Sequence, residues 1–150
     1  MRSALGAILL LAASIPACQS APEPTPESAV ELIQNHYRKI NEKQFEAAFK
    51  DWEGDGKASG KSLASFINVY VQTPRVEVTP GTPTPIEGAA GSRYITIPVH
   101  VTAYKVGGFK TEYAGNYVLR YSVVEGAKPR WQWRIYSQKL ERAAPADSTS

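Results

Sequence analysis

The chain has 150 residues, with 17 Lys and Arg against 14 Asp and Glu and a formal net charge of +3. These charges are scattered along the sequence, which excludes the clustered basic face of a nucleic-acid-binding protein. The chain contains one cysteine, so it can form no internal disulfide and the hydrophobic core must stabilise the fold alone. This length predicts a single folded domain.

The first 18 residues have the layout of a secretory signal peptide. Arg2 gives a basic start, an apolar run covers 4–13, and the small residue Ala17 precedes Cys18. A transmembrane helix would need about 20 apolar residues, more than this run supplies. An ordinary signal peptide cut after Ala17 is the other reading, but it would leave a lone thiol in an oxidising compartment.

A cysteine at the cleavage site resembles the lipobox of bacterial lipoproteins. That resemblance implies cleavage before Cys18, a diacylglycerol on its sulfur and a fatty acyl group such as palmitate on its amine. Two or more chains hold a protein stably on a membrane. Gln19 is not the acidic residue that retains such lipoproteins in the inner membrane. The resemblance therefore implies an outer-membrane lipoprotein that faces the periplasm.

The layout of the chain follows from this start. Cleavage removes Arg2 and lowers the formal charge to +2. Prolines in the next segment favour an extended tether, and the small polar residues at the end predict disorder. We therefore expect four parts: a signal peptide at 1–17, a lipidated Pro-rich tether at 18–26, the folded domain at 27–142 and a disordered tail at 143–150.

Helices are expected first in the domain. Apolar residues at helical spacing predict helices over 27–43, 44–52 and 62–71. Ser62 is expected to be the N-cap of the third helix. His36 lies one position away from the apolar stripe of the first helix, so it is expected to be exposed.

Two polar segments near the second helix offer no site. Asp51 and Asp55 fall at a helix end and in a Gly-rich turn, where solvated caps are the expected role. Residues 54–62 partly match the glycine-rich phosphate-binding loop of nucleotide-binding proteins. That motif needs a glycine where the chain has Asp55. We therefore reject a nucleotide-binding interpretation.

Strands follow the helices. Alternation and turn residues predict strands at 75–79, 92–106, 109–124 and 130–140, with a Pro-rich loop over 80–91. Gly107-Gly108 is typical of a two-residue hairpin, which would place Val106 opposite Phe109. In this register His100 faces Gly115. For the last pair of strands we expect Trp133 opposite Tyr121 and Ile135 opposite Leu119.

This register assigns side chains to the two faces of the sheet. The helices should cover the face that collects Tyr113, Tyr117, Leu119, Tyr121, Val123, Trp131, Trp133 and Ile135. The face away from the helices then carries an exposed apolar patch, which marks an interface and predicts a homodimer through the sheet. The residues of that candidate interface are Ile95, Ile97, Val99 and Val101.

The order of elements resembles a known family. Three N-terminal helices packed on a curved, mostly antiparallel four-stranded sheet form the α+β cone of NTF2-like (SnoaL-like) proteins. The resemblance rests on residues 36–52, on Tyr113 to Tyr117 and on Trp131 to Ile135. The chain looks more narrowly like NTF2-like lipoproteins of proteobacteria. This fold hosts enzymes, ligand binders and structural subunits, so the fold alone gives no function.

The residues bear on two enzymatic interpretations, an isomerase and a dehydratase. The ketosteroid-isomerase branch implies Tyr37 in an oxyanion site and a carboxylate base beyond the second helix, but residues 56–62 contain none. Scytalone-dehydratase-like members imply an inward histidine, here His100, but no carboxylate shares its face in the expected register. Two histidines without Cys or Asp partners predict no metal site.

The aromatic residues are the remaining signal. Tyr and Trp combine an apolar body with a polar tip, which suits a cavity wall, although a core of large residues is the alternative. The expected pocket takes a small apolar or aromatic ligand and is lined by Tyr37, Trp52, Tyr70, His100, Tyr113, Tyr117, Tyr121 and Trp133. We therefore expect a non-catalytic ligand- or partner-binding module of the cell envelope, without a cofactor. A dehydratase or isomerase, or a structural or assembly subunit, are the alternatives.

Overall fold

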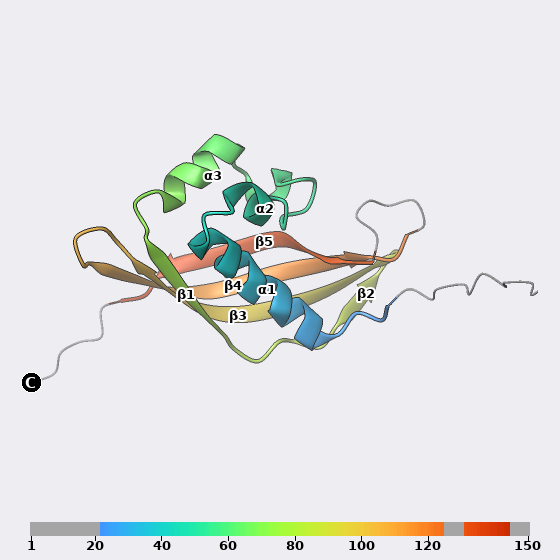
Figure 1. Cartoon of the computed structure of the whole chain (residues 1–150). Helices are drawn as coiled ribbons and strands as arrows, with labels where there is room; N and C mark the ends of the chain where they lie inside the picture. The colour runs from blue at the N-terminus through green and yellow to red at the C-terminus, as the bar shows by residue number, and fades with distance from the viewer. Residues whose placement is uncertain (1–21, 125–130, 145–150) are drawn as a thin grey trace, which may run out of the picture.

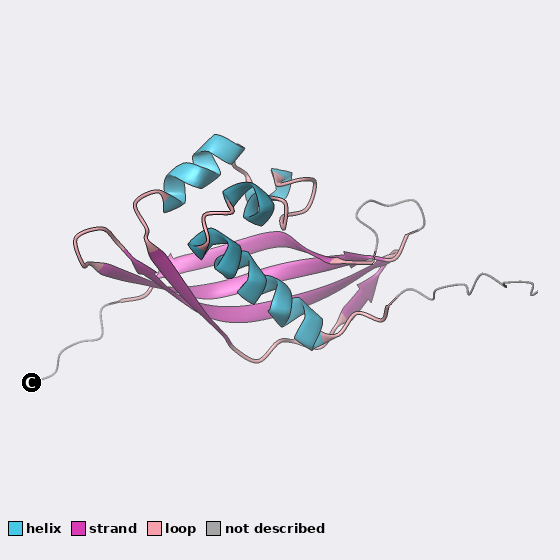
Figure 2. Cartoon of the chain, in the orientation of Figure 1, coloured by secondary structure: helices cyan, strands magenta, loops and turns pink. Residues whose placement is uncertain are grey.

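The computed structural model describes residues 22–124 and 131–144, and these form an α+β fold of one helical layer on one sheet (Figures 1 and 2). Helices α1 (Pro26–Asn41), α2 (Phe45–Phe49) and α3 (Leu63–Tyr70) lie on the same side of the sheet, and a short 3-10 turn, η1 (Lys57–Ser59), separates the last two. The expected signal peptide, the first part of the tether and most of the tail lie outside the described residues. Within the described part, no helix is long and apolar enough to cross a bilayer.

The sheet is antiparallel and follows the order β1-β3-β4-β5. Its four main strands are the ones expected from the alternation, and a short fifth strand, β2, pairs with the start of β3 inside the loop that was expected over 80–91. Three residues are too few to show alternation, so the pattern gave no signal for β2. The strands are β1 (Arg75–Pro80), β2 (Glu87–Ala89), β3 (Ser92–Tyr104), β4 (Lys110–Ser122) and β5 (Trp133–Arg142).

Helix α1 begins at a capping box. The Thr25 side chain accepts from the Ser28 backbone amide, and the Ser28 hydroxyl accepts from the amide of Thr25. His36 lies three residues after Ile33 and four before Ile40, so it falls on the buried stripe of the helix. It is fully buried, and the expectation that it is exposed is wrong.

The β3–β4 hairpin differs from the expected two-residue turn. The Lys105 amide donates to the Phe109 carbonyl at 2.7 Å, so three residues connect the paired positions instead of two. Gly107 and Gly108 both have positive φ, which this connection requires. The extra residue moves the register by one, and a shift of one residue exchanges the two faces of a strand.

As a result, the faces of β3 are the reverse of those expected. The candidate interface residues point into the core, where each is at most 5% exposed, so the predicted exposed patch is wrong. His100 pairs with Ala114 instead of Gly115 and is exposed, so its expected inward position is wrong as well. The four core residues are Ile95, Ile97, Val99 and Val101.

The β4–β5 register agrees with the expectation at Leu119–Ile135 and Tyr121–Trp133. The pairing then shifts by one residue between Val118 and Leu119. The chain after α2 joins the edge of β5. The Ile135 amide donates to the Asp51 carbonyl, and the Ile135 carbonyl accepts from the Glu53 amide, both at 2.9 Å. This bridge fixes Asp51 beside the sheet, facing α1.

Candidate functional site

A cavity of about 220 Å³ lies between α3, β1 and the inner face of the sheet. We call it the tyrosine cavity. It sits at the end of the sheet that carries the β3–β4 hairpin, because Ala103, Lys105 and Tyr113 all flank that turn. Its lining residues are Tyr37, Val69, Tyr70, Thr73, Val76, Val101, Ala103, Lys105, Tyr113, Gln138 and Leu140.

The tyrosine cavity combines aliphatic walls with a few polar groups. Its ionisable lining consists of three tyrosines and one lysine, and no carboxylate lines it among the described residues. The Lys105 ammonium donates to the Thr73 hydroxyl at 2.7 Å. A backbone hydrogen bond from Val106 to Gln72 ties the hairpin to the chain after α3 and holds these two residues together. Such a mixture is typical of pockets for small organic molecules.

Tyr37, on the wall of the tyrosine cavity, pairs with a second tyrosine that is buried behind it. The hydroxyl oxygens of Tyr37 and Tyr117 are 2.7 Å apart, and Tyr117 lies behind Tyr37 in the core. Burial raises the pKa of Tyr37 to about 12, an effect that the hydrogen bond with Tyr117 partly opposes. Burial also raises the pKa of Tyr70 and that of Tyr117. These phenols therefore stay neutral near pH 7 and act as hydrogen-bonding groups.

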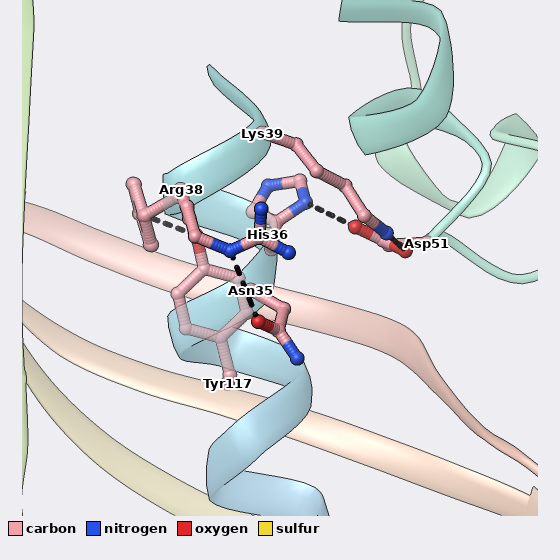
Figure 3. Close-up of polar contacts among 7 residues, drawn as sticks. Asn35, His36, Arg38, Lys39, Asp51 and Tyr117 are labelled. Carbon is pink, nitrogen blue, oxygen red and sulfur yellow. Dashed lines mark hydrogen bonds and ion pairs between the residues drawn. The ribbon is translucent and has the colours of Figure 1, made fainter. Parts of the chain in front are cut away.

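A second polar group is buried between α1 and the chain after α2. We call His36, Lys39 and Asp51 the His36 cluster. Figure 3 shows the two α1 side chains converging on Asp51. The Asp51 carboxylate accepts from Lys39 Nζ at 2.6 Å and lies 3.2 Å from His36 Nδ1. Asp51 is 2% exposed, so the expectation of a solvated cap is wrong.

No residue of the His36 cluster lines the tyrosine cavity. A carboxylate accepts only, so the Asp51 contact places a proton on Nδ1 of His36. His36 Nε2 has no partner among the described residues, and the ring packs against Tyr37, Trp52 and Phe66. Neither imidazole nitrogen reaches the tyrosine cavity wall, so the geometry gives that cavity no general base.

A shallower groove of about 400 Å³ runs along α1 from Ser28 to Lys39, and Lys39 and Asp51 of the His36 cluster line it. Two of the aromatic residues expected in the pocket lie here and bind the start of the domain. The Tyr121 hydroxyl donates to the Pro22 carbonyl at 2.6 Å, and the Trp133 indole N–H donates to the Ser28 hydroxyl at 3.0 Å. They hold the N-terminal segment against the sheet.

The structure thus divides the eight residues expected in one pocket. Tyr37, Tyr70 and Tyr113 line the tyrosine cavity. Tyr117 and Trp52 are core residues next to it, packed with ring centroids 6.2 Å apart. The remaining three lie elsewhere: Tyr121 and Trp133 in the groove along α1, and His100 on the outer face of the sheet.

Sequence reasoning missed the polar residues that join the tyrosines. Thr73 follows the third helix in a segment with no helical or strand pattern, so it gave no signal. Lys105 was expected in a strand, just before a two-residue turn whose register was wrong. Gln138 and Leu140 could not be found from the alternation of β5, because strict alternation from Trp133 and Ile135 places them on the outer face. The irregularity between Val118 and Leu119 shifts β5 by one residue and brings them to the inner face.

Comparisons with solved structures show the fold. The Kfla4162 protein of Kribbella flavida aligns over 79% of this chain and 90% of its own, with 12% identity and a TM-score of 0.55. A proposed scytalone dehydratase of Novosphingobium aromaticivorans aligns over 79% and 83%, with 8% identity and a TM-score of 0.54. An NTF2-like superfamily protein of Salmonella enterica serovar Typhimurium aligns over 80% and 92%, with 13% identity and a TM-score of 0.52.

No protein-family model matches the chain, and no curated protein matches it. At such low identities the solved structures inform on architecture alone. The expected fold class is confirmed: the chain has the NTF2-like α+β cone fold.

Proposed function

We propose that this protein is a lipid-anchored module of the cell envelope that binds a small molecule in the tyrosine cavity without transforming it. The observation that carries the proposal is the cavity itself, an aliphatic chamber with several hydroxyl groups and one ammonium on its wall. Hydroxyls fixed by the surrounding structure orient a ligand, while the aliphatic side chains supply most of the binding free energy.

The size of the tyrosine cavity limits the ligand. An apolar protein cavity of roughly 150 Å³ holds one benzene molecule. The volume of about 220 Å³ therefore suits a single ring with a short substituent, or an aliphatic molecule of similar size. Larger ligands would have to project through the mouth of the cavity.

The anchor rests on Cys18 and its resemblance to a lipobox. Pro22 lies four positions after Cys18 along the chain, and that length spans at most about 14 Å. Because Tyr121 binds Pro22, this end of the sheet would lie close to the outer membrane. Tyr113, in the tyrosine cavity, is eight residues away along β4, or about 27 Å. The cavity would then open toward the periplasm.

Native mass spectrometry tests the binding proposal. The Cys18→Ala domain is purified gently from periplasm, so that it carries no lipid, and compared with Ala103→Leu, which fills part of the cavity. A reproducible extra mass on the first protein, reduced on the second, supports the proposal. Bare masses for both, with no adduct from a panel of one-ring compounds, would oppose it. The mass of the native mature protein tests acylation of Cys18 separately.

A dehydratase or isomerase is the second candidate. The observation in its favour is the buried contact between His36 and Asp51, a pairing that often sets up acid–base chemistry. Its position outside the tyrosine cavity opposes it. This candidate predicts that His36→Gln abolishes turnover of a ligand found in the cavity. Recovery of that ligand unchanged after prolonged incubation supports the binding role.

A further inference from the structure

We propose that the tyrosine cavity selects a small carboxylic acid, whose carboxylate is held by the Lys105 ammonium and the Thr73 hydroxyl. This inference rests on the proposed binding function and names the class of its ligand. It is carried by a juxtaposition at the cavity wall, where a partly buried cation and a buried hydroxyl donor adjoin an aliphatic chamber.

The ammonium of Lys105 is paired with a neutral hydroxyl group. Its ammonium has three N–H donors, and in the described residues its one hydrogen-bond partner is the neutral hydroxyl of Thr73. No carboxylate of the described residues lies within ion-pair distance of it, whereas Lys39, Lys50 and Lys110 each contact one. A half-buried ammonium next to apolar walls gains more from an anionic partner than an exposed one does.

The surroundings of Thr73 are positively charged. This residue is 2% exposed, and two ammonium groups approach it from different elements. Lys105 binds its side chain, and the ammonium of Lys43, in the turn after α1, lies 3.4 Å from its carbonyl oxygen. Neither lysine has a carboxylate partner among the described residues. The wall at Thr73 is therefore electropositive, and the remaining polar lining groups are neutral.

The apolar and polar parts of the cavity lining follow one another along β3. Val76, Val101 and Ala103 belong to neighbouring strands β1 and β3 and form an aliphatic wall, and Lys105 continues that face of β3 at the hairpin end. A ligand with an apolar ring on this wall would direct a one- or two-carbon acid toward the lysine. The neutral phenols of Tyr37 and Tyr70 add donors without adding negative charge.

Matched probes separate this inference from the proposed function. Benzoate and benzamide have nearly the same shape, but only benzoate is charged at pH 7. Each is titrated into ¹⁵N-labelled Cys18→Ala protein while amide NMR shifts are recorded. We expect benzoate to bind at least tenfold more tightly than benzamide, with shifts at Thr73 and Lys105. An ammonium–carboxylate contact of this strength corresponds to about 1.4 kcal/mol.

Variants identify the group responsible. Lys105→Met should weaken benzoate at least tenfold and change benzamide by less than twofold, whereas Lys110→Met, which removes an exposed lysine of the same hairpin, should change neither. Thr73→Val tests the hydroxyl. If Lys105→Met unfolds, Lys105→Gln keeps a polar side chain of similar length and serves instead.

The outcomes are distinct. Equal affinities for benzoate and benzamide, or a benzoate affinity unchanged by Lys105→Met, overturn the carboxylate inference and leave a ligand-binding cavity. Saturable benzoate shifts at Trp133 instead of Thr73 overturn it as well, since they would place the anion in the groove along α1. Absence of binding by either probe opposes both the inference and the proposed function.

Discussion

The paired hydroxyls of Tyr37 and Tyr117 predict an unequal and coupled response to mutation. Removing one partner leaves a buried hydroxyl unsatisfied, at a cost of about 1 to 3 kcal/mol. Tyr37→Phe leaves the Tyr117 hydroxyl in the closed core, whereas Tyr117→Phe leaves a hydroxyl on the cavity wall, where water can reach it. We expect losses in the free energy of unfolding of about 2 kcal/mol for the first and about 1 kcal/mol for the second.

The double variant is the decisive member of this series. With both hydroxyls absent, no polar atom remains unsatisfied, so it should lose no more than either single variant, about 1 kcal/mol. The cycle then gives a coupling of about 2 kcal/mol. Urea denaturation measures it, since 2 kcal/mol moves the midpoint by about 1 M in a domain of this size. Strictly additive losses, with unchanged m-values, would refute the pairing.

Three further predictions concern stability. Burial raises the pKa of Tyr37 to about 12, so the stability that its neutral form contributes is complete below pH about 10 and is lost as the pH rises toward about 12. Urea midpoints should therefore fall between pH about 10 and about 12, and less so in Tyr37→Phe; equal falls would contradict the assignment. Gly115→Ala should destabilise by about 3 kcal/mol or prevent folding, because its Cβ would lie 1.9 Å from the Lys139 carbonyl oxygen; a wild-type melting temperature would count against the β4–β5 register. Asp51→Ala should cost about 3 kcal/mol in urea denaturation, because it leaves the buried His36 and the partly buried Lys39 without their carboxylate partner. Glu46→Ala, which breaks an exposed pair, is its control and should leave the midpoint unchanged.

The sequence predicts the elements of this fold better than their mutual register. Helical spacing gives α1 and α3, and Ser62 caps α3 as expected by accepting from the Ser65 amide. The register of β3 could not be read from its turn, because Gly-Gly supports both a two-residue and a three-residue connection. The strand's own alternation was the better guide. Aliphatic residues at odd positions and Thr, Pro and His at even positions place the odd positions in the core.

The candidate site was predicted only in part, because some of its residues meet only through the way the elements pack together. Tyr37, Tyr70 and Tyr113 follow from the aromatic pattern on the inner faces of their elements. Lys105 and Thr73 meet only because the hairpin folds against the chain after α3, a contact between segments that no local pattern records. The burial of His36 could have been deduced from the helical wheel, since it lies between two buried isoleucines on one face.

A crystal structure of the Cys18→Ala protein soaked with benzoate tests the central claim most directly. The account predicts the ring against Val76 and Val101, with a carboxylate oxygen within about 3.2 Å of Lys105 Nζ and of the Thr73 hydroxyl. Benzoate bound only in the groove beside Trp133, or an unoccupied tyrosine cavity at saturating benzoate, would contradict it.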